Sequence, residues 1–137
     1  DALLAQAFTP CDTLHKQGRQ QMDFLKMDGR AVFRFTAKAV PSAIDGVLKK
    51  ADIDMSQVDW VVPHQANARI LEMVSRRYGV PMEKIFSNID KVGNTSSASI
   101  PICLDQMRRG GLLLPGQTAI FVGFGGGLTY GAILIQM

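Results

Sequence analysis

The sequence predicts an α/β fold in which a mixed β-sheet is covered by helices. Two observations support this class. Helix-like and strand-like segments alternate along most of the chain, and two apolar strand-like segments at the C-terminal end are joined only by Gly125–Gly127. So tight a connection favours an antiparallel hairpin. With 137 residues, the chain is long enough for one domain with a core of its own.

The N-terminal part divides into a surface segment and a helix. Residues 1–29 are predicted to be a surface segment that leads into the domain, because they are mostly polar, contain proline and glycine, and lack periodicity. Residues 30–137 are predicted to form the domain itself. Over 30–51 the apolar residues recur at helical spacing, and Pro41 is expected to kink this helix or split it in two.

The remaining elements alternate between strands and helices. They are a strand over 58–62, a helix over 66–78, a strand over 84–89, a helix over 95–109, and strands over 117–124 and 128–137. Glycine follows both of these helices, as is typical of helix ends. Hydroxyl side chains stand at the start of the second one, where they can cap it.

Composition excludes several classes of protein. Hydrophobic residues make up 47% and charged residues 20%, which is ordinary for a globular domain and excludes a disordered tail. The net charge of +3 comes from a small basic surplus without a basic block, so nucleic-acid binding is not expected. The absence of a long apolar stretch and of a signal-peptide pattern argues against a membrane span or export. Cys11 and Cys103 fit no disulfide framework or zinc motif, which favours reduced thiols in the cytoplasm.

Polar residues or glycines follow three of the predicted strands. His64 follows the first, Asn94 follows the second, and the turn Gly125–Gly127 follows the third. Because ligand sites in open α/β sheets lie beyond the carboxyl ends of strands, we expect these groups to share one cavity. A neutral imidazole, a carboxamide and a backbone amide are uncharged donors that suit a carbonyl oxygen gaining negative charge. Taken singly, a structural histidine, a turn asparagine and a plain hairpin remain alternatives.

A nucleophile is missing from this pattern. Cys11 lies in the polar segment, and Cys103 lies near the middle of a helix among apolar neighbours. A free cysteine in such a place commonly behaves as a small buried hydrophobe. A hydrolase that uses Cys103 is an alternative that requires an accessible thiol.

The stretch from Asp59 to the C-terminus contains PHQAN, GNTS and FGGG, and it closely resembles the C-terminal half of the β-ketoacyl-acyl-carrier-protein synthase III family. The segment MDGRAVFRF also resembles that family. The resemblance implies a thiolase-like fold, in which two similar halves form a five-layered αβαβα architecture, and a homodimeric cytoplasmic enzyme. It implies an acyltransferase of fatty acid synthesis: acyl-CoA acylates a cysteine, and malonyl-acyl-carrier protein then decarboxylates and attacks the thioester. No cofactor besides these substrates is implied.

The resemblance also implies roles for five residues. His64 and Asn94 correspond to the catalytic partners of the cysteine, and Gly126 to a residue whose amide forms part of the oxyanion hole. Asn67 and Arg69 correspond to residues that contact the pantetheine arm and the incoming acyl-carrier protein or CoA. Chalcone-synthase-like polyketide enzymes share the histidine and asparagine but tend to carry a proline in the glycine turn, so the three glycines here favour synthase III.

The nucleophilic cysteine of that family lies in an N-terminal half, and Cys103 does not occupy its place. The chain also starts after the strand that opens the family's C-terminal half, so its sheet is expected to lack a strand and to expose apolar surface. We therefore expect the chain to be inactive alone and to need the N-terminal half of the same enzyme as a partner. A non-catalytic scaffold that binds acyl-carrier protein or CoA is the alternative.

Overall fold

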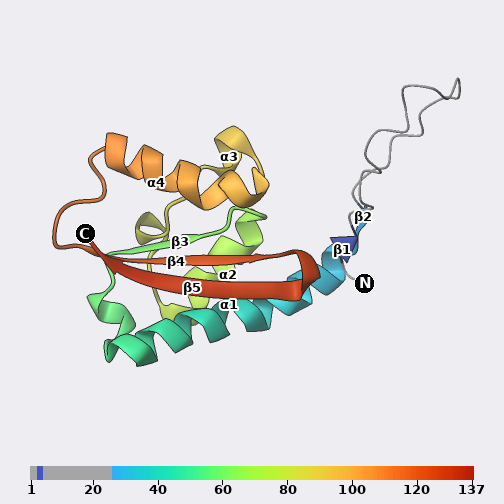
Figure 1. The fold of residues 1–137 in the computed structure, drawn as a ribbon, viewed down its shortest axis with the longest axis horizontal. Coiled ribbons are helices and arrows are strands. Elements are labelled where there is room, and N and C mark those ends of the chain that lie inside the picture. Colours follow the sequence, from blue (N-terminus) through green and yellow to red (C-terminus); the bar gives the residue numbers. More distant parts are fainter. Residues whose placement is uncertain (1–2, 5–25) are drawn as a thin grey trace, which may run out of the picture.

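A mixed sheet with helices on both faces forms the body of the molecule (Figure 1). The computed structural model describes residues 3–4 and 26–137. Strand β3 (Trp60–Pro63) runs parallel to β4 (Thr118–Gly125), and β4 pairs antiparallel with β5 (Thr129–Gln136). The predicted α/β class and the C-terminal hairpin are therefore confirmed.

The start of the chain is described at residues 3–4 and 26–29. Residues 5–25, with Cys11, lie outside the described residues. The short strands β1 (Leu3–Leu4) and β2 (Lys26–Met27) pair antiparallel, and helix α1 (Gly29–Ala51) begins directly after Asp28. The Asp28 carboxylate accepts hydrogen bonds from the Arg30 and Ala31 amides, both 3.0 Å long, and so caps the helix. Asp28 and Gly29 are exposed.

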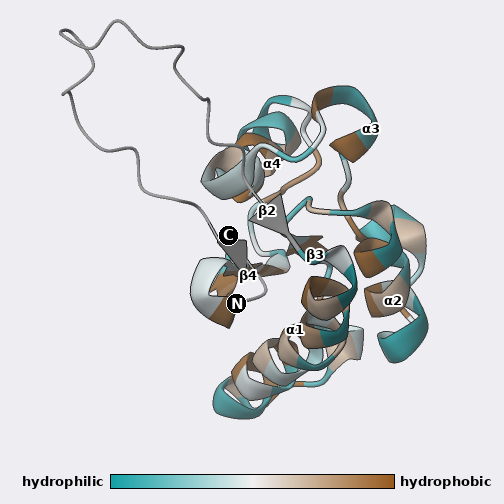
Figure 2. Cartoon of the chain, turned by 90° about the vertical axis from the view of Figure 1, so that its right-hand side faces the viewer, coloured by the Kyte–Doolittle hydropathy of each residue, from teal (hydrophilic) through white to brown (hydrophobic). Residues whose placement is uncertain are grey.

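Helices α1 and α2 (Ala68–Tyr78) pack on one face of the sheet. This face of the core is built from Val40, Ile44, Val61, Ile70, Leu71, Val74, Ile120 and Val122, among others. Figure 2 shows α1 and α2 on the same side, with the outer surface of α2 coloured hydrophilic. Gly79 ends α2 in the left-handed region, as the sequence predicts. Asn67 caps the start of α2, which lies two residues after the predicted start at residue 66.

The opposite face carries α3 (Ile89–Val92) and α4 (Ser99–Arg109) (Figure 1). Its core consists of Val62, Cys103, Met107, Leu113, Ala119 and Phe121. Successive residues of β4 therefore supply alternate faces, as the pleat of a strand requires. Within residues 26–137 there are also four 3-10 turns: η1 (Met55–Gln57), η2 (Met82–Lys84), η3 (Ser96–Ala98) and η4 (Gly126–Leu128).

Pro41 does not split α1, which continues through it to Ala51. A proline inside a helix removes the N–H that would bond the carbonyl four residues earlier. That carbonyl belongs to Ala37, which is exposed, so water can replace the lost donor. The Pro41 carbonyl accepts a hydrogen bond from the Tyr78 hydroxyl at 3.0 Å, which joins α1 to α2.

The strand predicted over 84–89 is wrong. Only one parallel bridge forms, between Val61 and Ile85, and η2 and α3 take up the neighbouring residues. Continuing the register of that bridge by two residues would bring Pro63 opposite Ser87. Proline has no N–H to donate, so the ladder ends there.

The hydroxyl groups at the start of α4 also do not cap it. The N-cap is Ala98, without a side-chain cap bond. The Ser99 hydroxyl instead accepts a 2.7 Å hydrogen bond from the Gln65 amide. The Thr95 hydroxyl oxygen is buried and has no hydrogen-bond partner among the described residues.

Strand β5 pairs only with β4 within the described part of the chain. Ile133 and Ile135 lie opposite Phe121 and Ala119, so they face the side that carries α4. Both are nevertheless exposed, Ile133 to 57% and Ile135 to 37%. The apolar surface expected from the sequence is therefore present along β5.

Replacing two glycines by alanine should change the free energy of unfolding in opposite directions. A Cβ at Gly79 or at Gly46 would meet no atom within 4 Å, but Gly79 has a φ of +63° whereas Gly46 lies inside α1. We expect Gly79→Ala to lower the free energy of unfolding by about 1–2 kcal/mol. Gly46→Ala should raise it by about 0.4–1 kcal/mol. Urea denaturation measures both, and a shift of the same sign in the two variants would contradict the assignment.

Candidate active site

A cavity of about 500 Å³ lies at the carboxyl ends of β3 and β4. Its lining comes from the first turns of α1, the ends of the two strands, and the segment before α4. The lining residues are Val32, Phe35, His64, Ala66, Asn94, Ser96, Ser97, Ile100, Gly123, Phe124, Gly125, Gly126 and Leu128. The structure thus brings His64, Asn94 and Gly126 together in one cavity, as expected, although the strand predicted before Asn94 does not form.

His64 stands directly after β3 and is half-buried. Its amide donates a 2.8 Å hydrogen bond to the Val122 carbonyl, so the backbone at this residue is held by β4. The imidazole packs edge-to-face on Phe124, with ring centroids 5.0 Å apart. Burial lowers the pKa of His64 below its usual 6.5. The ring is therefore neutral at pH 7, with one N–H donor and one acceptor nitrogen.

Asn94 is oriented by a turn of its own. It follows Gly93, whose φ is +66°, and its side-chain oxygen accepts a 2.9 Å hydrogen bond from the Ser96 amide. Ser96 itself has a φ of +54°. With the oxygen engaged, the Asn94 NH₂ group is left as the free end of the carboxamide, and no described residue accepts from it. A carboxamide in this state offers donors to a ligand.

The glycine turn closes the third side of the cavity. Gly127 has a φ of +71°, a conformation that glycine adopts without strain. The Thr129 hydroxyl donates a 3.1 Å hydrogen bond to the Gly126 carbonyl and fastens the turn to β5.

No Asp, Glu, Lys or Arg side chain from the described ranges lines this cavity. Its polar groups are neutral, and Val32, Phe35, Ile100 and Leu128 supply apolar walls. Such a site suits an anion that develops during a reaction better than one that arrives already charged.

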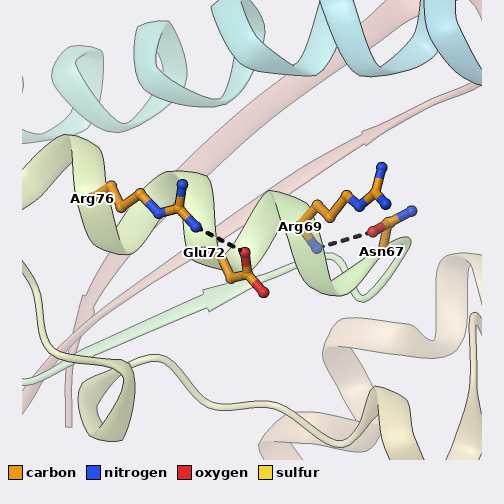
Figure 3. A network of polar contacts seen from close by, with 4 residues as sticks. All are labelled: Asn67, Arg69, Glu72 and Arg76. Atoms are coloured by element: carbon orange, nitrogen blue, oxygen red, sulfur yellow. Dashed lines mark hydrogen bonds and ion pairs between the residues drawn. The ribbon is translucent and has the colours of Figure 1, made fainter.

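Asn67 and Arg69 lie outside this cavity and line a neighbouring groove of about 720 Å³. Figure 3 shows how they are tied together: the Asn67 side-chain oxygen accepts a 2.9 Å hydrogen bond from the Arg69 amide and caps α2. Further along α2, Arg76 forms an ion pair with Glu72 at 3.1 Å. The Asn67 oxygen is thus used by the helix, while the exposed Arg69 guanidinium stands over the groove.

The groove contains two cationic residues that the sequence analysis missed. Arg30 and Arg34 extend from the start of α1 and line it together with Arg69. Within the chain as described, none of the three has a carboxylate within 4.0 Å. The sequence did contain a signal for Arg30 and Arg34: they are four residues apart on a predicted helix, which places their guanidinium groups on the same side of it.

Cys103 cannot act as the missing nucleophile in this conformation. It is fully buried between α4 and the sheet, and its thiol donates to the Asn88 side-chain oxygen at 3.5 Å. Burial raises the pKa of the thiol to about 11. The hydrolase alternative, which required an accessible thiol, is therefore contradicted. Among the described residues no group of three His, Cys, Asp or Glu could hold a metal ion.

The mixed sheet with this site at its strand ends defines the C-terminal half of a thiolase-like protein. The family model described as "3-Oxoacyl-[acyl-carrier-protein (ACP)] synthase III C terminal" matches residues 48–137. The chain belongs to this family.

Relatives and solved structures agree with this assignment. The β-ketoacyl-[acyl-carrier-protein] synthase III of Clostridium novyi is 44% identical over 94% of this chain and 42% of its own length. The crystal structure of 3-oxoacyl-(acyl carrier protein) synthase III from Pseudomonas aeruginosa PAO1 matches with a TM-score of 0.85 and 34% identity, over 99% of this chain and 39% of that one. The priming β-ketosynthase of the R1128 polyketide pathway matches with a TM-score of 0.70 and 40% identity, over 82% and 34%.

The chain spans about two-fifths of the length of the curated relatives that it matches, 42% in the first two. None of the helices in the described ranges has the length and hydrophobicity needed to cross a membrane.

The environment of His64 predicts a measurable titration. Because burial lowers its pKa, NMR should place the midpoint of its ring-proton shifts below 6.5, with signals assigned through His64→Asn. The folded state then binds this proton less readily than the unfolded state, so the free energy of unfolding should decline as pH falls below 6.5. A midpoint above 6.5 would contradict a desolvated neutral imidazole.

Proposed function

We propose that this chain supplies the decarboxylation half of the active site of a β-ketoacyl-acyl-carrier-protein synthase III. The observation that supports the proposal most directly is the convergence of His64, Asn94 and the glycine turn in one cavity without charged side chains. In this proposal the complete enzyme condenses an acyl group taken from acyl-CoA with malonyl-acyl-carrier protein, in the initiation step of fatty acid synthesis.

The chemistry requires donors that stabilise an enolate. When a malonyl thioester loses CO₂, the electron pair of the broken carbon–carbon bond moves onto the thioester carbonyl as an enolate. His64 and the free NH₂ group of Asn94 donate hydrogen bonds to that oxygen. Because the imidazole is neutral, it stabilises the charge without delivering a proton that would quench the carbanion. The carbanion then attacks the acyl thioester, forms the new carbon–carbon bond and releases the enzyme thiolate.

The acyl thioester has its own oxygen to stabilise during that attack. The amide of Gly126 at the glycine turn is assigned to this oxyanion hole, together with the amide of the acylated cysteine. That cysteine belongs to the N-terminal half of the same enzyme, which is the first proposed partner. Residues 30–137 are then the C-terminal thiolase-like half-domain, and the complete enzyme is a cytoplasmic homodimer that needs no cofactor beyond its substrates.

The groove beside the cavity fits the entry route of the substrates. Arg30, Arg34 and Arg69 line it, against one carboxylate residue, Asp28, and carrier proteins and CoA are both anionic. We assign Asn67 and Arg69 to the pantetheine arm and to the docking of acyl-carrier protein or CoA. Because cations at a docking site act mainly on encounter, they should govern the association of acidic carrier proteins.

A polyketide-priming condensation is the second candidate. It is favoured by the similarity to the R1128 priming β-ketosynthase, which is 40% identical over 82% of this chain. The proposed chemistry of His64 and Asn94 is the same in both cases, so the two candidates differ in the carrier protein and in the fate of the product. A non-catalytic scaffold would bind the same partners without turnover.

The donor roles predict a division between the two half-reactions. In the full-length protein, His64→Ala and Asn94→Ala should each lower malonyl decarboxylation by about 100–1,000-fold, the usual effect of removing one such donor. Transfer of the acyl group from CoA to the cysteine should be largely spared, because it depends on the backbone oxyanion hole. Release of CO₂ from labelled malonyl-acyl-carrier protein and burst acylation by labelled acyl-CoA measure the two steps.

Lys50→Ala, at an exposed residue near the end of α1 that lines neither the cavity nor the groove, is the control and should leave both steps unchanged. Equal loss of both half-reactions in each variant would exclude the division. A full-length protein that binds malonyl-acyl-carrier protein but releases no CO₂ would support the scaffold.

The cationic groove predicts a salt-dependent defect. Arg69→Glu should raise KM for malonyl-acyl-carrier protein far more than it changes kcat, and the defect should shrink at high salt. Lys49→Glu makes the same change of charge and serves as the control. Lys49 lies near the end of α1, roughly 30 Å along the helix from Arg30 at the groove. Steady-state kinetics at two ionic strengths measures both variants, and an unchanged KM in Arg69→Glu would remove the docking role.

A further inference from the structure

Gln65, the residue after His64, is fully buried and polar. Its carboxamide nitrogen donates to the Pro63 carbonyl at 2.8 Å and to the Phe86 carbonyl at 3.2 Å. Its carboxamide oxygen accepts a hydrogen bond from the backbone N–H of Asn88 at 3.3 Å. The backbone N–H of Gln65 donates to the Ser99 hydroxyl at 2.7 Å. Through its side chain and its backbone N–H, this one buried residue connects the end of β3 to the segment before α3 and to the start of α4.

The side chain takes the place of a missing peptide group. The bridge Val61–Ile85 sets a parallel register in which Pro63 would face Ser87. In that register the amide of residue 63 would donate to the Phe86 carbonyl, and its carbonyl would accept from the Asn88 amide. Proline lacks the amide. The Gln65 carboxamide donates to Phe86 and accepts from Asn88 in its stead, and its second N–H satisfies the Pro63 carbonyl.

The same contacts hold both ends of the segment that carries Asn94. Asn88 lies just before α3, Ser99 is the first residue of α4, and Asn94 lies between them. Gln65 bonds to both ends and is covalently joined to His64, whose amide is fixed on β4. The positions of the His64 and Asn94 backbones therefore depend on one shared residue.

We propose that Gln65 is a positioning residue that sets the separation between the His64 imidazole and the Asn94 carboxamide. The proposal rests on the function proposed above, because both donors must reach one enolate oxygen. Hydrogen-bond donors to a developing oxyanion act at about 2.7–3.1 Å. A misplacement of about 1 Å can lower a rate by about 100-fold.

Gln65 does not contact the enolate itself, since it lies outside the lining of the cavity. Its loss should therefore act on the geometry of the two donors and not on substrate binding. A purely structural role predicts another pattern, in which both half-reactions fall together as the protein becomes less stable.

The test uses the full-length protein with two variants and a matched control. Ser99→Ala removes the acceptor of the Gln65 amide. Gln65→Glu keeps the shape of the side chain but turns an oxygen toward the carbonyls of Pro63 and Phe86. The control, Cys103→Ala, deletes a fully buried group of the same polar cluster, the thiol that donates to Asn88, and leaves the four bonds of Gln65 intact.

We expect Ser99→Ala and Gln65→Glu to lower kcat for malonyl decarboxylation by about tenfold to 100-fold. KM for malonyl-acyl-carrier protein and the rate of acyl transfer to the cysteine should change by less than about twofold, since neither depends on the two donors. Cys103→Ala should keep the wild-type ratio of decarboxylation to acyl transfer, whatever its melting temperature. If Gln65→Glu does not fold, Ser99→Ala decides.

A Ser99→Ala protein whose decarboxylation and acyl transfer fall in the same proportion would overturn the positioning role. So would a Cys103→Ala protein that loses decarboxylation selectively. Failure of the proposed function has a different signature, because the unsubstituted full-length protein would then release no CO₂ from malonyl-acyl-carrier protein.

Discussion

The burial of β4 is the constraint on which the rest of the structure depends. Ala119 to Val122 are almost inaccessible to solvent, and both edges of the strand are hydrogen-bonded, to β3 and to β5. Because successive side chains point to opposite faces, this one strand supplies both cores. Ile120 and Val122 face α1 and α2, while Ala119 and Phe121 face α4. Helices cover both faces of the sheet because β4 presents apolar side chains on both faces.

The position of the candidate site follows from the same strand. β3 and β4 run parallel, so their carboxyl ends meet at one edge, and this pairing places His64 next to the glycine turn. Asn94 arrives from a different direction, on an irregular segment without regular strand pairing. It is held by its own turn and by the buried contacts around Gln65. The least regular part of the site is thus supported by the most buried polar group next to it.

The success of the sequence predictions depended on whether the decisive interaction was local. Helices α1 and α2 and the β4–β5 hairpin were predictable, because apolar periodicity, a glycine stop and a short glycine connection depend on neighbouring residues. The strand over 84–89 failed for a non-local reason: its partner strand presents Pro63 at the position where an amide is needed. The role of Gln65 was invisible for the same reason, since a glutamine at a strand end is ordinarily solvated. Proximity of His64 and Gly126 was predictable from the ends of β3 and β4. Asn94 reaches the same cavity although the strand expected before it does not form. The groove of Arg30 and Arg34 depended on how α1 lies against α2.

The parallel pairing of β3 with β4 has a consequence for how the molecule assembles. Trp60 pairs with Ala119, 59 positions away along the chain, whereas the β4–β5 hairpin closes over three residues. Local hairpins form within microseconds, while pairing across a long intervening segment must first overcome the entropy of closing it. The glycine turn should therefore take shape early, and His64 should reach it only when β3 docks. If folding follows this order, the cavity forms only when β3 pairs with β4, and a chain that has folded only its hairpin has no cavity.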